Sequence, residues 1–268
     1  MKFGKKLDII GPLTRINPIF TLIIMFLCLI VTPMHSQTFK SIQLNHGRVR
    51  EAYSENLKSI EALLKNKGIE ITEMEVFLRG IKHDKKLELF AKNKKDSTFQ
   101  LIKQYDFCVL SGELGPKRKQ GDMQVPEGFY HINRFNPSSI FFLSLGIDYP
   151  NLSDKKLSDA GDVGGDIFIH GDCVSVGCIP ITDELIKELY VICVEARNNG
   201  QKEIPVHIFP FRMEGYSNNR LHYSTDMNRL QFWDSLVNGY QFFEERKELP
   251  KMKINASGYY YLDDNSPS

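Results

Sequence analysis

The chain has 268 residues, 42% of them hydrophobic and 25% charged, and its formal net charge at pH 7 is +1. This length and composition can bury the core of one large domain, or of one domain with an accessory piece. Basic and acidic residues are interspersed, which predicts a solvated surface and excludes the basic patch of a nucleic-acid-binding protein.

Residues 1–36 are typical of an export signal. Basic residues, among them Lys2 and Arg15, precede an apolar stretch at 19–31. This stretch is shorter than the ~20 residues that cross a bilayer, which favours a signal peptide. Cleavage after Ser36 and retention as a signal anchor both stay open. We expect the exported chain in the periplasm or cell envelope, attached to the membrane only through an uncleaved N-terminal segment.

Residues 37–70 are predicted to form a helical segment that packs on the main domain. Apolar residues between Arg48 and Lys67 recur at steps of three and four, with charges between them, as in an amphipathic helix. Gly68 is well placed to end this helix.

The main domain is predicted to span residues 71–250 and to begin with β-structure. Short apolar runs at 76–81, 87–91, 99–102 and 105–110 are separated by polar turns, which predicts an antiparallel meander. Turn-forming residues dominate from 111 to 165, with strands predicted at 129–132 and 141–143. His131 is either a structural histidine or part of a cleft. Residues 151–165 are predicted to form a surface loop that could gate such a cleft.

The densest chemistry lies between His170 and Cys178, in the segment HGDCVSVGC, directly after an apolar run that predicts the end of a buried strand. A thiol reacts as the thiolate, and its free pKa of ~8.5 leaves few thiols ionised at neutral pH unless a base such as imidazole is near. A tight loop would bring His170 to the sulfur of Cys178. Gly177 permits a sharp turn that points backbone N–H groups at a developing oxyanion.

Spacing alone leaves three other interpretations open. Cys173 and Cys178 could form a disulfide, could bind zinc together with His170, or could be small buried residues. A zinc site would need a fourth ligand, which is not evident. After export, Cys108, Cys173, Cys178 and Cys193 would meet oxidising conditions. A catalytic Cys178 must stay free, so at most one disulfide fits an enzyme.

Beyond this segment the sequence predicts a helix, a strand and a second helix. Thr182 is a predicted N-cap for an amphipathic helix, and residues 204–212 are predicted to form a strand. Arg212 either binds a substrate carboxylate through two hydrogen bonds or is an ordinary surface residue. An aromatic stripe at 229–244 predicts a helix that packs in the core, and residues 251–268 are predicted to form a tail.

The pattern His170-Gly171 followed by Ser175-x-Gly177-Cys178 resembles the signature of the L,D-transpeptidase (YkuD-type) catalytic domain family, most closely its YafK-like branch. The resemblance extends over about residues 75–243. It implies an α+β fold: a β-rich catalytic domain with flanking helices, after the N-terminal signal or anchor segment.

The resemblance also implies a cysteine-dependent enzyme that acts on peptidoglycan stem peptides and needs no cofactor or metal. Cys178 would attack the carbonyl of an L,D bond to form a thioester acyl-enzyme, and His170 would be the base. Backbone N–H groups at Gly177 and Cys178 would hold the oxyanion, and Ser175 would orient His170 or shape the turn. Many relatives have an arginine two residues after the nucleophile, where this chain has Pro180.

The direction of reaction stays open at this stage. An amine that resolves the acyl-enzyme would form an L,D bond, whereas water would hydrolyse it, as in an L,D-endopeptidase that releases wall-linked protein. Gly171, Arg212 and His131 are the candidate substrate-binding residues. The alternative function is a non-catalytic wall-binding module in which Cys173 and Cys178 are bridged or bound to zinc.

Overall fold

The structure is a computed structural model that describes residues 37–158, 161–216, 221–222 and 224–263. Apart from Gln37, these residues belong to one compact unit, Thr38–Ser268. The predicted export segment, 1–36, lies outside the described residues. None of the described helices combines the length and the apolar character needed to cross a membrane.

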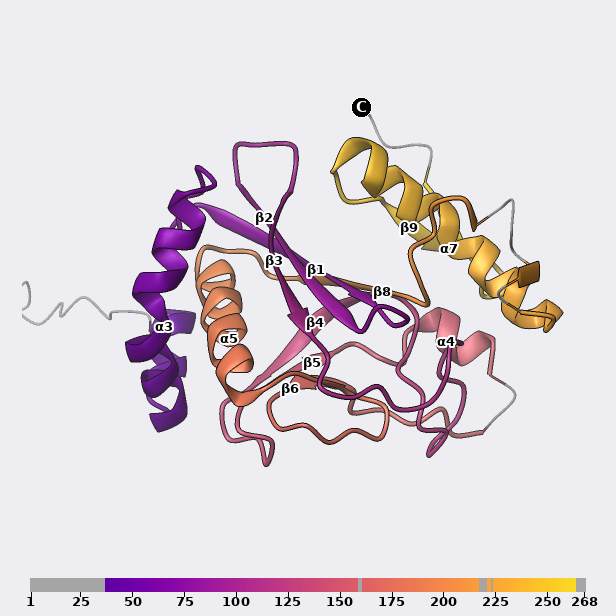
Figure 1. Cartoon of the computed structure of the whole chain (residues 1–268), viewed down its shortest axis with the longest axis horizontal. Coiled ribbons are helices and arrows are strands. Elements are labelled where there is room, and N and C mark those ends of the chain that lie inside the picture. Colours follow the sequence, from indigo (N-terminus) through magenta and orange to yellow (C-terminus); the bar gives the residue numbers. More distant parts are fainter. Residues whose placement is uncertain (1–36, 159–160, 217–220, 223, 264–268) are drawn as a thin grey trace, which may run out of the picture. The chain divides into compact units, whose positions relative to one another are not determined.

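An eight-stranded mixed sheet forms the centre of this unit (Figure 1). Its strands, in chain order, are β1 (Met74–Ile81), β2 (Lys86–Asn93), β3 (Gln100–Asp106), β4 (Gly128–Asn136), β5 (Ser144–Ile147), β6 (Phe168–His170), β7 (Ile179–Pro180) and β8 (Ile204–Phe209). The spatial order is β3-β2-β1-β8-β4-β5-β6-β7. The pairs β1–β8 and β6–β7 are parallel and the others are antiparallel. The predicted antiparallel meander is confirmed for β1, β2 and β3, but the runs predicted separately at 99–102 and 105–110 share the single strand β3, and residues 107–110 are not part of a strand.

Helices cover both faces of the sheet. On one face lies α5 (Asp183–Asn198), and α2 (Phe39–Gln43) and α3 (Gly47–Lys65) pack on its outer side (Figure 1). The other face carries α7 (Met227–Arg246) and the two-stranded sheet β9 (Met252–Ile254) and β10 (Tyr260–Leu262). Because α5 is packed between the sheet and α3, its residues from Leu189 to Ala196 are all buried.

Side chains alternate between these two faces along each strand. Val206 and Ile208 of β8 belong to the core beneath α5, whereas Phe209 packs with Trp233 and other aromatic side chains of α7. The strands therefore carry one hydrophobic core beneath α5 and two clusters on the face of α7, the smaller of which is formed by Phe77, Phe90, Phe99 and Phe243.

The predicted capping of α5 is confirmed, because the Thr182 hydroxyl accepts a hydrogen bond from the N–H of Leu185 (3.3 Å). The strand predicted at 141–143 is wrong: these residues form a turn before β5, in which Phe142 has a φ of 68°. The apolar run predicted a strand because Leu143 is indeed buried, but the backbone reverses direction there.

Two stretches predicted without regular structure contain some. The surface loop predicted at 151–165 includes the short helix α4 (Leu152–Lys156), whose Asp154 is fully buried. Where a tail was predicted, β9 and β10 form a hairpin, and the Tyr260 hydroxyl oxygen accepts a hydrogen bond from Nδ2 of Asn151 (2.7 Å). Short elements of this kind carry too few residues for a periodic pattern.

Candidate active site

Strands β6 and β7 place Cys178 beside the start of β6. Ile169 is the register partner of Ile179, and His170 that of Pro180, so Cys178 falls next to Phe168 one position earlier. The thiol lies 3.8 Å from the carbonyl oxygen of Asp166. The backbone N–H of Phe168 also faces the sulfur, where it favours the thiolate and partly offsets burial, which raises the pKa of Cys178.

The imidazole of His170 and the thiol of Cys178 lie on the same face of the sheet. His170 is two residues beyond Phe168, and side chains two apart on a strand share a face. Ile169 and Ile179, which alternate with them, are fully buried in the core beneath α5. Both reactive groups therefore face away from α5, on neighbouring strands.

The imidazole is held in one tautomer. Its Nδ1 is hydrogen-bonded to the carbonyl oxygen of Gly171. A carbonyl only accepts, so Nδ1 carries the hydrogen and Nε2 is the basic nitrogen. The ring stacks on Phe141, with centroids 4.5 Å apart. Burial lowers the pKa of His170 below its usual value, which keeps the imidazole neutral and able to accept a proton.

The thiol is also neutral in the resting site. Burial, and then the nearby carboxylate of Asp166, raise the pKa of Cys178, against the opposing effects of the Phe168 N–H and Lys117. Within the described part of the chain, no hydrogen bond joins this thiol to His170 directly. The sequence interpretation assumed a thiolate formed in advance by the imidazole. The environment instead favours a thiol that loses its proton when it attacks.

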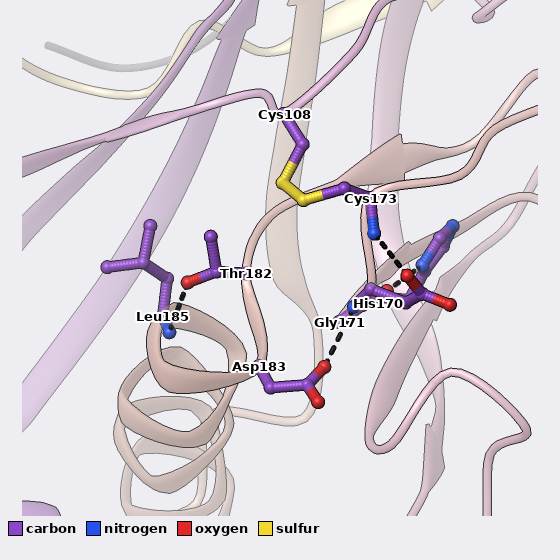
Figure 2. Close-up of a disulfide and its surroundings, with 8 residues drawn as sticks. Cys108, His170, Gly171, Cys173, Thr182, Asp183 and Leu185 are labelled. Carbon is purple, nitrogen blue, oxygen red and sulfur yellow. Dashed lines mark hydrogen bonds between the residues drawn. A yellow bond between two sulfur atoms is a disulfide. The ribbon is translucent and has the colours of Figure 1, made fainter.

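Gly171 begins the loop between the two reactive residues, and packing requires glycine there. A Cβ at this position would lie 2.3 Å from Oδ1 of Asp183, the atom that accepts the N–H of Asp172 (2.8 Å). Figure 2 shows Asp183, at the start of α5, reaching back to this loop. Gly171 is thus buried, and its carbonyl orients His170.

Ser175 and Gly177 shape the turn that leads into Cys178. The Ser175 hydroxyl donates to the carbonyl of Cys178 (2.8 Å) and accepts the N–H of Gly177 (3.2 Å). Gly177 has a φ of 124°, and a Cβ there would lie 3.0 Å from the carbonyl oxygen of Gln124. Of the two roles predicted for Ser175, the side-chain contacts match the shaping of the turn.

A disulfide between Cys108 and Cys173 fastens this loop to the segment after β3 (Figure 2). Cys108 also donates its N–H to the carbonyl of Pro180 in β7 (2.9 Å). Cys178 and the buried Cys193 are free thiols, so the Cys173–Cys178 bridge, one of the two forms of the alternative function, does not form. Among the described residues, no cluster of three or more His, Cys, Asp or Glu could hold a metal ion.

The other two candidate substrate-binding residues are engaged elsewhere. His131 in β4 pairs through Nδ1 with Asp148 (3.1 Å). Arg212, after β8, binds Asp84 and Glu88, each at 2.8 Å. Neither side chain is hydrogen-bonded to the segment between His170 and Cys178, and the geometry does not bring them to the thiol.

The sequence interpretation did not identify two charged residues near the thiol, Arg134 and Asp166. Arg134 in β4 pairs with Asp166 (2.6 Å), and its guanidinium lies 4.6 Å from the centre of the Phe168 ring. Only the register of the strands brings these residues to Cys178. A sequence signal for them is absent, because Arg134 is 44 positions away and belongs to an ordinary polar stretch.

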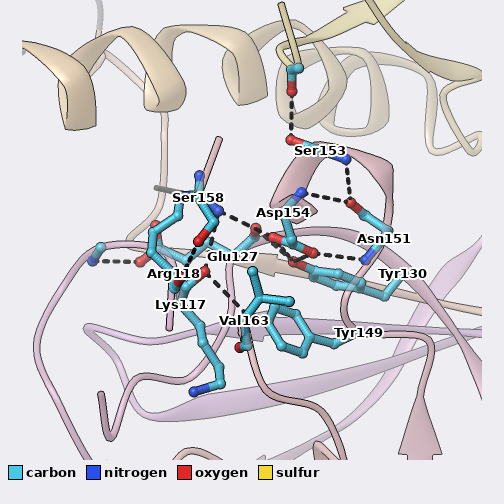
Figure 3. Close-up of polar contacts among 12 residues, drawn as sticks. Lys117, Arg118, Glu127, Tyr130, Tyr149, Asn151, Ser153, Asp154, Ser158 and Val163 are labelled. Atoms are coloured by element: carbon cyan, nitrogen blue, oxygen red, sulfur yellow. Dashed lines mark hydrogen bonds and ion pairs between the residues drawn. The ribbon is translucent and has the colours of Figure 1, made fainter. Parts of the chain in front are cut away.

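A buried polar network contacts the loop at 107–127, which lies between β3 and β4 (Figure 3). Both carboxylate oxygens of Asp154 lie 3.1 Å from the Tyr130 hydroxyl, and Oδ1 pairs with Arg118 (3.2 Å). Burial raises the pKa of Asp154 to about 6, although Asn151 and Arg118 oppose this shift. The network joins α4 to β4 and to the loop that precedes β4.

The fold and this site define an α+β protein with a cysteine and a buried histidine on one face of a mixed sheet. The model of the L,D-transpeptidase catalytic domain family, YkuD, matches residues 81–208. The chain is 36% identical over 186 residues to the Escherichia coli (strain K12) protein named "Putative L,D-transpeptidase YafK", covering 69% of this chain and 72% of that protein. The chain therefore belongs to the L,D-transpeptidase (YkuD) family, as predicted, which makes it a peptidoglycan-related enzyme at the level of the family.

Two solved structures align with part of this chain. The helical cell shape determining protein Pgp2 from Campylobacter jejuni aligns with a TM-score of 0.41 at 19% identity, over 68% of this chain and 73% of that one. Bdellovibrio bacteriovorus Bd1075 aligns with a TM-score of 0.36 at 23% identity, over 63% and 62% of the two chains.

Proposed function

We propose that this chain is an exported acyl-transfer enzyme in which Cys178 attacks an L,D peptide bond of peptidoglycan stem peptides. The observation that carries the proposal is the pair on one sheet face: a free thiol at Cys178 and a neutral imidazole at His170, whose Nε2 is left basic by the bond from Nδ1 to Gly171. Family membership supplies the substrate class.

The first half-reaction needs only these two side chains and the turn. Sγ of Cys178 forms a bond to the substrate carbonyl carbon while its proton passes to Nε2 of His170. The carbonyl oxygen becomes an oxyanion, for which the backbone N–H of Cys178 is the nearest candidate donor, since the N–H of Gly177 is already bound to Ser175. The tetrahedral adduct then collapses, and the departing amine takes the proton from His170, which leaves a thioester.

The second half-reaction runs through the same groups. An amine or a water molecule attacks the thioester carbonyl and gives its proton to His170, and Sγ leaves and recovers that proton. With an amine the product is a new L,D linkage, and with water it is a cleaved peptide. Hydrolysis could also release protein attached to the wall. The acceptor decides the direction, because the nucleophile and the base serve both.

The test is mass spectrometry of purified muropeptides incubated with the protein lacking residues 1–36, compared with Cys178→Ala and His170→Gln. The wild type is expected to change stem-peptide masses by loss of D-alanine, by exchange or by cross-linking, and each outcome identifies the direction. A carbapenem is expected to add its full mass to Cys178. Full activity of Cys178→Ala would contradict the proposal.

A further inference from the structure

A bulge in β4 turns Arg134 towards the face that carries Cys178. Ile132 is the register partner of Ile147, but the next pair joins Arg134 to Gly146, so β4 has one residue more than β5 at this point. Ile132 lies in the core beneath α5. Without the extra residue Arg134 would share that face, and with it the side chain points to the opposite, open one.

The strand register then forms a row across four strands. Arg134 is beside Gly146, Gly146 is beside Phe168, and Phe168 is beside Cys178. Gly146 has no side chain to separate its neighbours: a Cβ there would lie 3.1 Å from the Phe168 ring and 3.2 Å from Cβ of Arg134. The guanidinium therefore crosses over Gly146 and stacks on Phe168, with its centre 4.6 Å from that of the ring.

Asp166 completes this group and joins it to the thiol. Its carboxylate binds Nη2 of Arg134 (2.6 Å), and its carbonyl oxygen lies 3.8 Å from Sγ of Cys178. The side chains of Arg134 and Asp166 are 51% and 78% exposed. An ion pair this exposed contributes little to folding stability, so a ligand can replace either partner at small cost.

We propose that Arg134 is a specificity-determining residue, whose guanidinium binds a free carboxylate of the peptide that Cys178 attacks. Arginine binds carboxylates through two parallel N–H groups, and stacking on Phe168 fixes the plane of this fork. The displaced carboxylate of Asp166 then faces the same ligand, where it favours an ammonium group. This inference rests on the proposed function and names the chemistry of its substrate.

The carboxylate has two possible sources, the C-terminal D-amino acid and the side chain of the diamino acid. Three synthetic tetrapeptides distinguish them: one with both carboxylates free, one amidated at the C-terminus and one amidated on the diamino acid. We expect the wild type to have a kcat/KM at least about tenfold lower for one of the amidated peptides, because a charge-assisted hydrogen bond is lost. That peptide identifies the source.

In Arg134→Ala, the peptide with both carboxylates free and the amidated peptide that the wild type disfavours are expected to react at equal rates. The reason is a higher KM for the free peptide, with an unchanged kcat. Arg134→Lys should restore part of the preference, because it keeps the charge without the fork. Arg246→Ala is the matched control: Arg246 also stacks on a phenylalanine, with its guanidinium 5.0 Å from the Phe242 ring, but it lies on α7. This control should keep the full preference.

Calorimetric titration of the same peptides into Cys178→Ala, with and without Arg134→Ala, measures recognition without turnover. Loss of affinity for the free peptide alone supports the inference. A wild type that reacts equally with all three peptides overturns it, as does a preference that survives in Arg134→Ala or disappears in Arg246→Ala. Failure of the proposed function would be seen separately, as a wild type that forms no acyl-enzyme and changes no muropeptide.

Discussion

The pKa of Cys178 is raised first by burial and, to a smaller extent, by the carboxylate of Asp166 beside it. Removal of this carboxylate should therefore lower that pKa. Asp166→Asn is the suitable change, because asparagine tolerates the left-handed backbone found there (φ 54°). At pH values below the pKa of the thiol, Cys178 of the variant should react with iodoacetamide up to about twofold faster than Cys178 of the wild type. The effect is small because the exposed charge of Asp166 is screened by water.

The measurement is the rate of alkylation of Cys178 against pH, with Cys178→Ala to subtract other thiols. Asp106→Asn removes an equally exposed carboxylate that pairs with Lys86 and should leave the rate unchanged. An alkylation rate that falls in Asp166→Asn would show that the carboxylate acts on the thiol mainly through backbone geometry.

At the scale of residues, the sequence indicates His170 and Cys178 as candidate catalytic residues, because they lie in one short segment with two glycines, and their catalytic roles stay a prediction. It could not predict the ionisation of the pair, because the directions of both pKa changes follow from burial, which depends on the packed structure. Nor could it place Arg134 at the site. Its position depends on one extra residue in β4, whose only trace in the sequence is the three-residue step from Ile132 to Phe135, and a step of three does not by itself indicate a bulge.

Among the elements, the loop between β6 and β7 depends on the Cys108–Cys173 disulfide. This bond closes a loop with a sequence separation of 65 residues. The double variant Cys108→Ala/Cys173→Ala should lose about 2–4 kcal/mol of unfolding free energy. It should also lose turnover, because the loop that positions Gly171 and Cys178 is no longer fastened to β3.

Urea denaturation and muropeptide turnover test this prediction. Dithiothreitol should lower both quantities in the wild type towards those of the double variant, and should change the double variant no further. Equal turnover in the variant and the oxidised wild type would mean that the hydrogen bonds of Ser175 and Asp183 hold the loop without the disulfide.

Helix α4 carries a carboxylate whose protonation stabilises the fold. The pKa of Asp154 is raised to about 6 in the folded protein, from an ordinary value of 3.8. The folded state therefore binds this proton more tightly, and the stabilisation is complete below about pH 4 and lost as the pH rises through 6. The unfolding free energy of the wild type minus that of Asp154→Asn should fall by about 3 kcal/mol across this interval.

Urea denaturation of both proteins at several pH values between 4 and 8 gives this difference directly. Titrations of other groups cancel in the subtraction. A difference that stays flat across this range would mean that Arg118 compensates the burial of Asp154 fully.

For elements, periodicity predicted the long helices, because α3 and α7 each bury one apolar stripe and α5 begins with one before it becomes buried on all sides. It failed for α4, where five residues are held by the cap of Asn151 and by the buried Asp154 rather than by an apolar stripe. Local hydrogen bonding and tertiary contacts decide such short pieces.

At the scale of the whole molecule, the order of the strands could not be predicted. β8 lies between β1 and β4, although more than a hundred residues separate it from β1 in the sequence. Hydrophobic patterns identify strands but do not say which of them pair. The α+β class could be predicted, because the resemblance to a known family carries the whole topology with it.

A buried ion pair joins the residue after β1 to the residue before β4. Lys82 and Glu127 are both fully buried, with Nζ 2.9 Å from Oε1, and the other oxygen of Glu127 accepts the indole N–H of Trp233 in α7 (2.7 Å). Trp233→Phe keeps an aromatic ring but removes this donor. It should cost about 1–3 kcal/mol of unfolding free energy, because a buried charged oxygen is left without its partner.

Tyr240→Phe is the matched control, since it also removes one donor from α7, but its acceptor, Glu214, is exposed and can bind water instead. Circular dichroism should follow the unfolding, because Trp233 is the only tryptophan of the chain. If both variants lose the same stability, the buried network is not what couples α7 to the sheet. If only Trp233→Phe loses stability, its turnover should fall as well. Glu127, which binds Trp233, lies three residues after Gln124, and the carbonyl of Gln124 packs against Gly177 in the turn that leads to Cys178.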